Sequence, residues 1–146
     1  MAFRVFLDLT VLLDFTLKGA GYDRSRKLML WTVNGRIQAY VTPAVLQEAS
    51  RRLRQAYGPA RTNELLLALL AELSVIDTGH TVVVSALHST MSDREEALSY
   101  YTALNNKLDY FITWDTSLLR IVNPVLPVTT PIDFLNRHAP QPKRIS

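Results

Sequence analysis

Residues 3–14 read FRVFLDLTVLLD, and this stretch decides the fold. Its short apolar run, Val5–Leu7, ends abruptly on the carboxylate of Asp8. A run of this length is typical of a strand buried on both faces, as in a parallel sheet covered by helices. Ligands bind such sheets just beyond the carboxyl ends of the strands, so Asp8 is the first functional candidate. The alternative interpretation is that Asp8 only caps the helix that follows it.

A second strand with the same ending is expected much later in the chain. Residues Tyr110–Trp114 are largely apolar and aromatic, and Asp115 follows them directly. Two strands that each deliver a carboxylate to the same edge of a parallel sheet indicate a site, although Asp115 also suits the N-cap of a short helix.

The bulk composition predicts one globular domain. The chain has 146 residues, of which 48% are hydrophobic and 20% charged, enough for a core without disulfides or structural metals. We expect the domain to span residues 1–138 and the polar residues 139–146 to form a frayed tail. Cysteine is absent, which argues against disulfides and thiolate metal sites and fits a cytoplasmic protein. No apolar stretch suits a membrane span, and no secretion signal is apparent.

Strands and helices alternate along the chain, which predicts an α/β fold with a mostly parallel sheet. Thr42 and Pro43 are a typical helix start, and Gly58-Pro59 is expected to break that helix. Ser92 as N-cap with Glu95 three residues later has the pattern of a capping box. Residues 81–84 fit either a strand or an extended loop. The other expected elements are helices over 11–18, 24–34, 65–73, 92–108, 118–119 and from 131, and strands over 37–41, 74–76 and 125–128.

Further acidic residues stand where this fold can bring them to the same edge of the sheet. Glu48 lies on the helix after Thr42-Pro43, and Asp93, Glu95 and Glu96 lie at the start of a later helix. Each has a plainer explanation. Glu48 can pair with a nearby arginine, and Glu95 can complete the capping box. Asp93 and Glu96 can complement the helix dipole. Taken together these explanations lose force, because gathered carboxylates repel one another.

A divalent cation with oxygen ligands is the usual remedy for such repulsion. The chain has no HExxH pattern, no cysteine and only three scattered histidines, which argues against zinc. Mg²⁺ or Mn²⁺ suits an all-carboxylate site, where the ion also holds water and phosphate oxygens. The sequence pI is about 9.4, with 16 basic against 13 acidic residues. A basic surface around an acidic metal site is what a nuclease acting on a polyanion needs.

These residues resemble the motifs of PIN-domain proteins, in the family's order. Residues 6–14 resemble the opening motif, commonly an Asp-x-Asn followed by an apolar turn and a second aspartate. Residues 42–48 resemble the short Ser/Thr-led helix that carries a glutamate. Residues 93–98, 110–115 and 130–135 resemble the two later acidic motifs and the C-terminal ending, so the resemblance runs through nearly the whole chain.

The resemblance implies a three-layer α/β/α fold around a sheet of about five strands, and a Mg²⁺- or Mn²⁺-dependent endoribonuclease. It further implies a VapC-type toxin, for which RNA is the substrate and an antitoxin protein the partner. A homodimer is also implied. Leu28, Leu30 and Trp31 are candidates for its interface, unless they are ordinary core residues.

The ligand set implied for the metal is Asp8, Glu48, Asp93 or Glu96, and Asp115. Two positions depart from the family pattern. Thr10 stands where the family has asparagine, so the hydrogen bond that orients Asp8 is weakened or replaced. Glu96 stands where the family has aspartate, and Asp93 lies three residues earlier on the same helix face, so both stay candidates. The Thr113 hydroxyl is expected to orient a water or Asp115.

Two other function classes fit parts of the sequence. A degenerate PIN domain that only binds a protein or RNA is favoured by the departures at Thr10 and Glu96, and disfavoured by the acids at all four positions. A haloacid-dehalogenase-like phosphatase would need an aspartate in place of Thr10 and a later lysine, for which Lys107 is expected inside a helix. The candidate RNA-backbone contacts are Arg24, Arg26 and Lys27, which a solvated helix face explains equally well.

Overall fold

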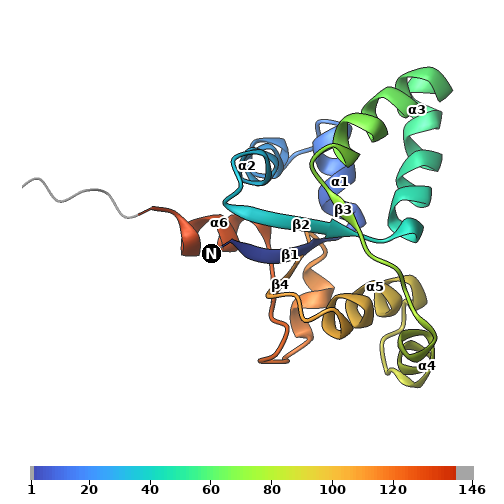
Figure 1. Cartoon of the computed structure of the whole chain (residues 1–146), viewed down its shortest axis with the longest axis vertical. Coiled ribbons are helices and arrows are strands. Elements are labelled where there is room, and N and C mark those ends of the chain that lie inside the picture. The colour runs from blue at the N-terminus through green and yellow to red at the C-terminus, as the bar shows by residue number, and fades with distance from the viewer. Residues whose placement is uncertain (1, 141–146) are drawn as a thin grey trace, which may run out of the picture.

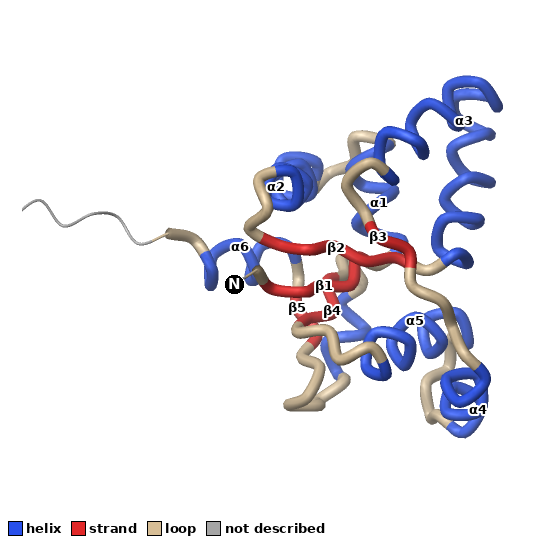
Figure 2. The backbone as a smooth tube through the Cα atoms, viewed as in Figure 1, coloured by secondary structure: helices blue, strands red, loops and turns tan. Residues whose placement is uncertain are grey.

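The sheet is built from five parallel strands in the order β3-β2-β1-β4-β5 (Figures 1 and 2). The structure is a computed structural model that describes residues 2–140, so the expected tail beyond residue 140 lies outside the described residues. The strands are β1 (Phe3–Leu7), β2 (Ile37–Val41), β3 (Ser74–Val75), β4 (Tyr110–Ile112) and β5 (Val128–Thr129). The predicted mostly parallel sheet is confirmed.

Helices cover both faces of this sheet and make the three layers that were predicted. α1, α2 and α3 lie on one face, and α5 with α4 beside it lies on the other (Figure 1). No helix among residues 2–140 is long and apolar enough to cross a membrane. The helices are α1 (Leu9–Thr16), α2 (Tyr22–Val33), α3 (Pro43–Leu70), α4 (His80–His88), α5 (Arg94–Asn105), the 3₁₀ helix η1 (Thr116–Arg120) and α6 (Pro131–His138).

The central position of β1 explains its unbroken apolar run. β1 pairs with β2 on one side and β4 on the other, and Val5, Phe6 and Leu7 are fully buried. Phe6 stacks on Phe111, its register partner in β4, with ring centroids 5.1 Å apart. The strand order continues away from β1 in both directions, so the crevice where ligands bind in such sheets lies beyond the carboxyl ends of β1 and β4.

α3 begins and breaks at the residues that the sequence predicts. The Thr42 hydroxyl accepts a hydrogen bond from the backbone N–H of Val45 at 3.2 Å, as a helix N-cap does. At Gly58 the backbone φ is +78°, in the left-handed region that glycine tolerates. The helix therefore bends at Gly58 into two arms that spread apart from the bend (Figure 1).

Residues 81–84 are neither a strand nor a loop, because α4 spans them. Their run of three valines after a threonine favours extended backbone when read alone. Packing decides otherwise. Val82 and Ala86, four residues apart, are buried, and α4 lies against α5. Burial of this face outweighs the weak propensity of the run.

The end of α5 also differs from the expected one. The helix stops at Asn105 rather than Leu108, because Lys107 is left-handed (φ +56°) and the N–H of Leu108 turns back to the Ala103 carbonyl at 3.2 Å. Lys107 thus lies past the helix end, where it lines a hollow with Thr81 and other residues of α4 and α5.

Candidate active site

Adjacent strand ends bring the first two carboxylates to one edge of the sheet. Asp8 follows β1 directly, and its backbone N–H donates to the Ile112 carbonyl of β4 at 3.0 Å. Asp115 lies three residues beyond Ile112 and is the N-cap of η1, with its side chain accepting from the Ser117 N–H at 3.0 Å. Both aspartates therefore stand at the carboxyl edge of neighbouring parallel strands.

Two threonine hydroxyls hold the side chain of Asp8. Asp8 Oδ2 accepts from Thr10 Oγ1 at 2.9 Å and from Thr113 Oγ1 at 2.7 Å. Only 5% of the surface of Asp8 is exposed, and Thr113 is fully buried. Burial raises the pKa of the Asp8 carboxyl, against the opposing effect of the hydroxyl hydrogen bonds from Thr113 and Thr10.

Thr10 supplies the hydrogen bond that an asparagine was expected to give. Its hydroxyl donates to Asp8 and accepts from the backbone N–H of Trp114 at 3.0 Å, which ties the start of α1 to the segment after β4. Thr113 Oγ1 accepts from the Asp115 N–H at 2.9 Å. A single hydroxyl thus connects the backbone of Asp115 to the carboxylate of Asp8.

The start of α5 brings a third acid to this edge. The N-cap is Asp93, not Ser92, and Asp93 Oδ1 accepts from the Glu96 N–H at 3.1 Å. Glu96, rather than Glu95, therefore occupies the third helical position. Ser92 and Asp93 are both good N-caps, so local sequence preference cannot decide between them, and the register of α5 follows its buried face instead.

Glu96 faces Asp115 instead of completing a capping box. The two carboxyls share a hydrogen bond, and partial burial together with the charges of Asp115, Asp93 and Asp8 raises the pKa of Glu96 to about 8. The pKa of Asp115 is lowered by hydrogen bonds from Ser117 and Glu96. At neutral pH the pair therefore holds one proton, carried mainly by Glu96.

Glu48 faces the same edge from α3 but is held by arginines. Its carboxylate accepts from Arg51 Nε at 3.1 Å and from Arg52 Nε at 3.2 Å, and these hydrogen bonds lower its pKa to about 2. The surface ion pair anticipated from the sequence is thus present. It does not remove Glu48 from the site, because Glu48 and Arg52 line the same pocket as Asp8.

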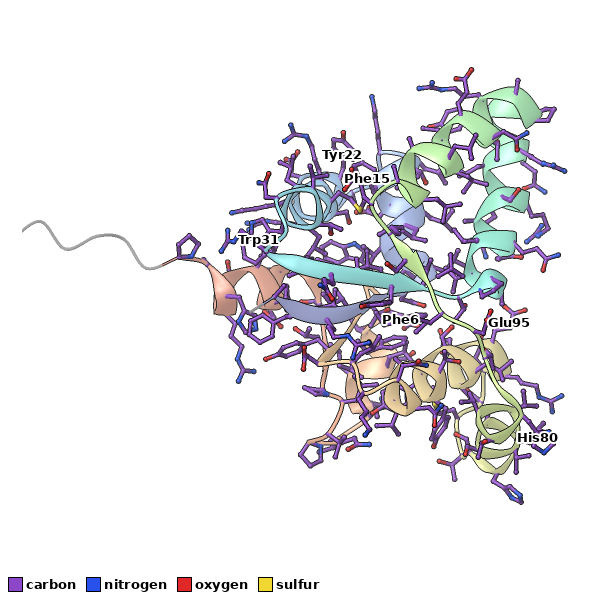
Figure 3. All side chains as sticks on the ribbon, viewed as in Figure 1. Phe6, Phe15, Tyr22, Trp31, His80 and Glu95 are labelled. Carbon is purple, nitrogen blue, oxygen red and sulfur yellow. The ribbon has the colours of Figure 1, made fainter. Side chains whose placement is uncertain are left out.

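This pocket has a volume of about 390 Å³ and lies between α1, the start of α3 and the start of α5. Figure 3 shows Glu95, one of its lining residues, between the base of α3 and α5. Four of the predicted acids line the pocket, Asp8, Glu48, Asp93 and Glu96, and Asp115 is joined to them through Glu96.

The donor set of this pocket fits Mg²⁺ or Mn²⁺, although it is not a finished cage. Among residues 2–140 no three acidic or histidine side chains are already grouped around one point as metal ligands. The contacts explain why, since Glu48 is turned to its arginines and Glu96 to Asp115. All the available ligands are hard oxygens, and Glu96 lies among the charges of Asp115, Asp93 and Asp8, which a divalent ion would neutralise.

The residues predicted to contact RNA lie elsewhere. Arg24 lines a hollow with Asp14 and Trp114, and Arg26 lines an apolar groove between α2 and α3. Lys27 is exposed on the same helix, α2. None of these three cations lines the carboxylate pocket, and their contact with RNA stays a prediction.

Of the three residues suggested for a dimer interface, two are buried and one is exposed. Leu28 and Trp31 are buried in the core of their own chain, so they are wrong as interface candidates. The period of α2 could not distinguish a core stripe from an interface stripe. Leu30 is 41% exposed and lines the apolar groove.

The sequence did not predict a partly buried polar network that joins Trp114, Ser25 and Asp14. Trp114 Nε1 donates to Ser25 Oγ at 3.0 Å, and Ser25 Oγ donates to Asp14 Oδ2 at 2.6 Å. Gly21 packs so closely on the Trp114 ring that an added Cβ would lie 2.5 Å from it. The sequence signal was the second aspartate of the opening motif, Asp14, with the glycines that follow it.

Comparison with protein families gives a match over most of the chain. The sequence model of the PIN domain matches residues 4–117, which include all the acids of the pocket. No curated protein sequence matches the chain.

Solved structures share the fold at low sequence identity. A DNA-bound VapBC complex from Salmonella typhimurium contains a chain with a TM-score of 0.66 and 14% identity, covering 88% of this chain and 98% of that one. A toxin–antitoxin complex from Klebsiella pneumoniae gives 0.65 and 15%, with coverages of 87% and 97%. VapC20 of Mycobacterium tuberculosis, a toxin that cleaves the sarcin–ricin loop, gives 0.63 and 13%, with coverages of 81% and 96%.

Proposed function

The chain belongs to the PIN-domain family, and we propose that it is a metal-dependent endoribonuclease, the toxin of a toxin–antitoxin pair. One observation carries the proposal. Carboxylates that follow β1, begin α5 and follow β4 meet at one edge of the sheet, where partial burial and then the neighbouring acids Asp115, Asp93 and Asp8 raise the pKa of Glu96 to about 8. The nearby solved structures include toxins and their antitoxin complexes, which supports this class of function.

The residues proposed to hold Mg²⁺ or Mn²⁺ are Asp8, Glu96 and Asp115, with Asp93 and Glu48 at the rim of the pocket. A bound ion of this kind supplies activation of water and neutralisation of charge on the scissile phosphate. Glu96 would have to lose the proton it shares with Asp115, and Glu48 would have to turn from its arginines.

The chain itself orients the acids. Thr10 and Thr113 fix one oxygen of Asp8, so the other oxygen, Oδ1, is left for a ligand. The partly buried network of Trp114, Ser25 and Asp14 holds the segment after β4 against α2. Such support keeps the carboxylates in place when no cation is present.

The antitoxin is proposed to occupy the apolar groove between α2 and the second arm of α3. Its floor includes Phe15, Met29 and Leu65, and Lys18, Arg26 and Arg61 stand among its lining residues. An apolar floor with a cationic margin suits an amphipathic protein segment that carries acidic residues. The groove is separate from the carboxylate pocket, with which it shares no lining residue.

The test of the proposed activity is RNA cleavage by Asp8→Asn. We expect Mg²⁺- or Mn²⁺-dependent cleavage to be lost while the fold stays intact, because the amide keeps the size of the side chain and can still accept both threonine hydrogen bonds. Asp133→Asn, on α6 and exposed, is the matched control and should cleave as the wild type does. Wild-type protein that binds neither ion by calorimetry and cleaves no RNA would favour the degenerate binding module instead.

The phosphatase interpretation loses its second requirement. Lys107 lies past the end of α5 and lines a hollow that shares no residue with the carboxylate pocket. No cation is therefore offered to Asp8 from that position.

A further inference from the structure

A polar groove on α3 continues outward from the carboxylate pocket. The two hollows share Ala44, Glu48 and Glu95, so they form one continuous depression. The outer part has a volume of about 770 Å³. Its other lining residues are polar or cationic and lie on α3: Gln47, Ser50, Arg51, Arg54 and Gln55.

The amphipathic pattern of α3 creates this groove. Val45, Ala49 and Leu53 form the buried stripe that fixes the helix on the core. The arginines stand on the solvent side of the same helix. The row begins at an acid of the pocket, Glu48, and reaches Arg54 six residues later, about 9 Å further along the helix axis. The cations thus lead away from the pocket in one direction.

We propose that this groove binds the phosphodiester backbone of single-stranded RNA beside the scissile bond, with Arg51 and Arg54 contacting phosphates. The inference rests on the proposed ribonuclease function, which it deepens by saying along which path the substrate leaves the pocket. Guanidinium groups bind phosphate oxygens through paired hydrogen bonds. The neutral side chains of Gln47, Ser50 and Gln55 suit the remaining phosphate and sugar oxygens, which are contacted without regard to sequence.

The contacts that Arg51 and Arg54 make in the structure are compatible with phosphate binding. Arg51 is paired with Glu48, but the Arg51 side chain is 59% exposed, and ion pairs in contact with solvent contribute little to stability. Exchange of the carboxylate for a phosphate therefore costs little. Arg54 forms no salt bridge within the described part of the chain, so its charge is available without any exchange.

RNA is favoured over an acidic protein segment by the position and the lining of the groove. It opens directly into the pocket of carboxylates, where a substrate has to pass. The groove is polar, in contrast to the apolar groove between α2 and α3 that suits a protein partner. Lys107 after α5 and Arg137 on α6 carry the same charge, are exposed and line neither of these two hollows, so they provide matched controls.

The test measures binding without chemistry. A short fluorescent oligouridine is titrated with the full chain in EDTA, and the anisotropy gives the affinity over a range of salt concentrations. Each lost phosphate contact should reduce the slope of log K against log salt by about 0.7 for a single strand. We expect a reduction of about 0.7 for Arg54→Gln and about 1.4 for Arg51→Gln/Arg54→Gln. The control Lys107→Gln/Arg137→Gln removes the same charge and should keep the wild-type slope.

Several outcomes would overturn the inference. The first is a wild type that does not bind the RNA. The second is a wild-type slope in the α3 double variant, and the third is an equal loss of slope in the Lys107→Gln/Arg137→Gln control. Binding of polyglutamate as tight as that of RNA, with the same loss in the variant, would assign the groove to an acidic protein instead. Unfolding midpoints of all variants are compared with that of the wild type, since these exposed side chains should leave the fold unchanged.

Cleavage is measured separately, so that the two proposals fail separately. Wild-type protein that binds RNA through Arg54 but cleaves none with Mn²⁺ retains the groove and loses the ribonuclease function. Protein that cleaves RNA while the α3 variants bind normally retains the ribonuclease function and loses the groove. If both proposals hold, Arg54→Gln should raise KM and leave kcat close to that of the wild type.

Discussion

Binding of the divalent ion should release a proton from Glu96. The pKa of this carboxyl is raised to about 8 in the metal-free protein, mainly by partial burial and by Asp115. Glu96 is then about 0.9 protonated at pH 7, about half protonated at pH 8 and about 0.1 protonated at pH 9. A carboxylate must be ionised to hold a metal, so binding should release those same fractions of a proton.

The affinity for the metal therefore depends on pH in a defined window. It should rise almost tenfold between pH 6 and pH 7 and level off above about pH 9. The pKa of Asp8 is also raised by burial, so Asp8 gives the metal affinity a pH dependence of the same sign. Glu48 does not add to it, because its pKa of about 2 keeps it ionised throughout.

Calorimetry with Mn²⁺ measures the released proton directly. Titrations at pH 7 in buffers with different ionisation enthalpies give the number of protons from the slope of the observed enthalpy. The matched variant is Glu96→Gln, which keeps the size of the side chain but cannot titrate. Its metal binding should be weaker, and the proton release should fall by about 0.9 at pH 7. Equal release in both proteins, or none in the wild type, would refute this account of Glu96.

The same variant, Glu96→Gln, tests in which direction the titration of Glu96 changes the free energy of unfolding as the pH rises. The folded-state pKa of Glu96 lies above its ordinary value of 4.5, so the metal-free folded state binds the extra proton. Its contribution to stability is complete below about pH 4.5 and is lost as the pH rises through about 8. The difference in unfolding free energy between Glu96→Gln and the wild type should therefore move in favour of the variant from pH 5 to pH 8. Taking the difference cancels the opposite contribution of His138, whose pKa is lowered by burial.

Three further expectations concern the residues that support the site and the partners of the chain. Gly21→Ala should cost about 1–3 kcal/mol of stability by chemical denaturation, because the new Cβ would lie 2.5 Å from the Trp114 ring. Gly79→Ala, which meets open space, is the control, and an equal cost in both would contradict the argument. The homodimer implied by the family resemblance stays a prediction that light scattering checks, and a monomer at high concentration would remove it. Leu30→Glu should abolish binding of the proposed antitoxin and leave such a dimer intact; a monomeric variant would instead assign the groove to a second copy.

The strand ends could be predicted because a strand that is buried on both faces has an uninterrupted apolar run in the sequence. Val5–Leu7 is apolar without interruption since β1 is the central strand, and Asp8 is visible as the first polar residue after it. The register of α5 was not predictable at the same level, because Ser92 and Asp93 compete as N-caps on equal terms. Only packing of the helix decides for Asp93 and thereby turns Glu96 toward Asp115.

The side chains that bind the acids could not be predicted from any local sequence pattern. Glu48 lies within reach of arginines three and four residues away, so the sequence showed both a surface ion pair and a site residue. The structure shows that the two are compatible, because Glu48 lines the pocket while it holds the arginines. The prediction for residues 81–84 was wrong for a related reason. The helix there is favoured by its packing against α5, which lies outside the run itself.

Every acid at the proposed site has a temporary partner in the metal-free protein. Asp8 is held by two hydroxyls, Glu96 by a proton shared with Asp115, and Glu48 by Arg51 and Arg52. A divalent ion that takes these carboxylates would displace the proton and release the arginines toward the groove on α3. Metal binding and RNA binding should therefore reinforce each other. The coupling is reciprocal, so RNA should raise the affinity of the wild type for a divalent ion that does not support cleavage, and this gain should shrink in Arg51→Gln. An RNA affinity that is the same with and without such an ion would show that the arginines act independently of Glu48.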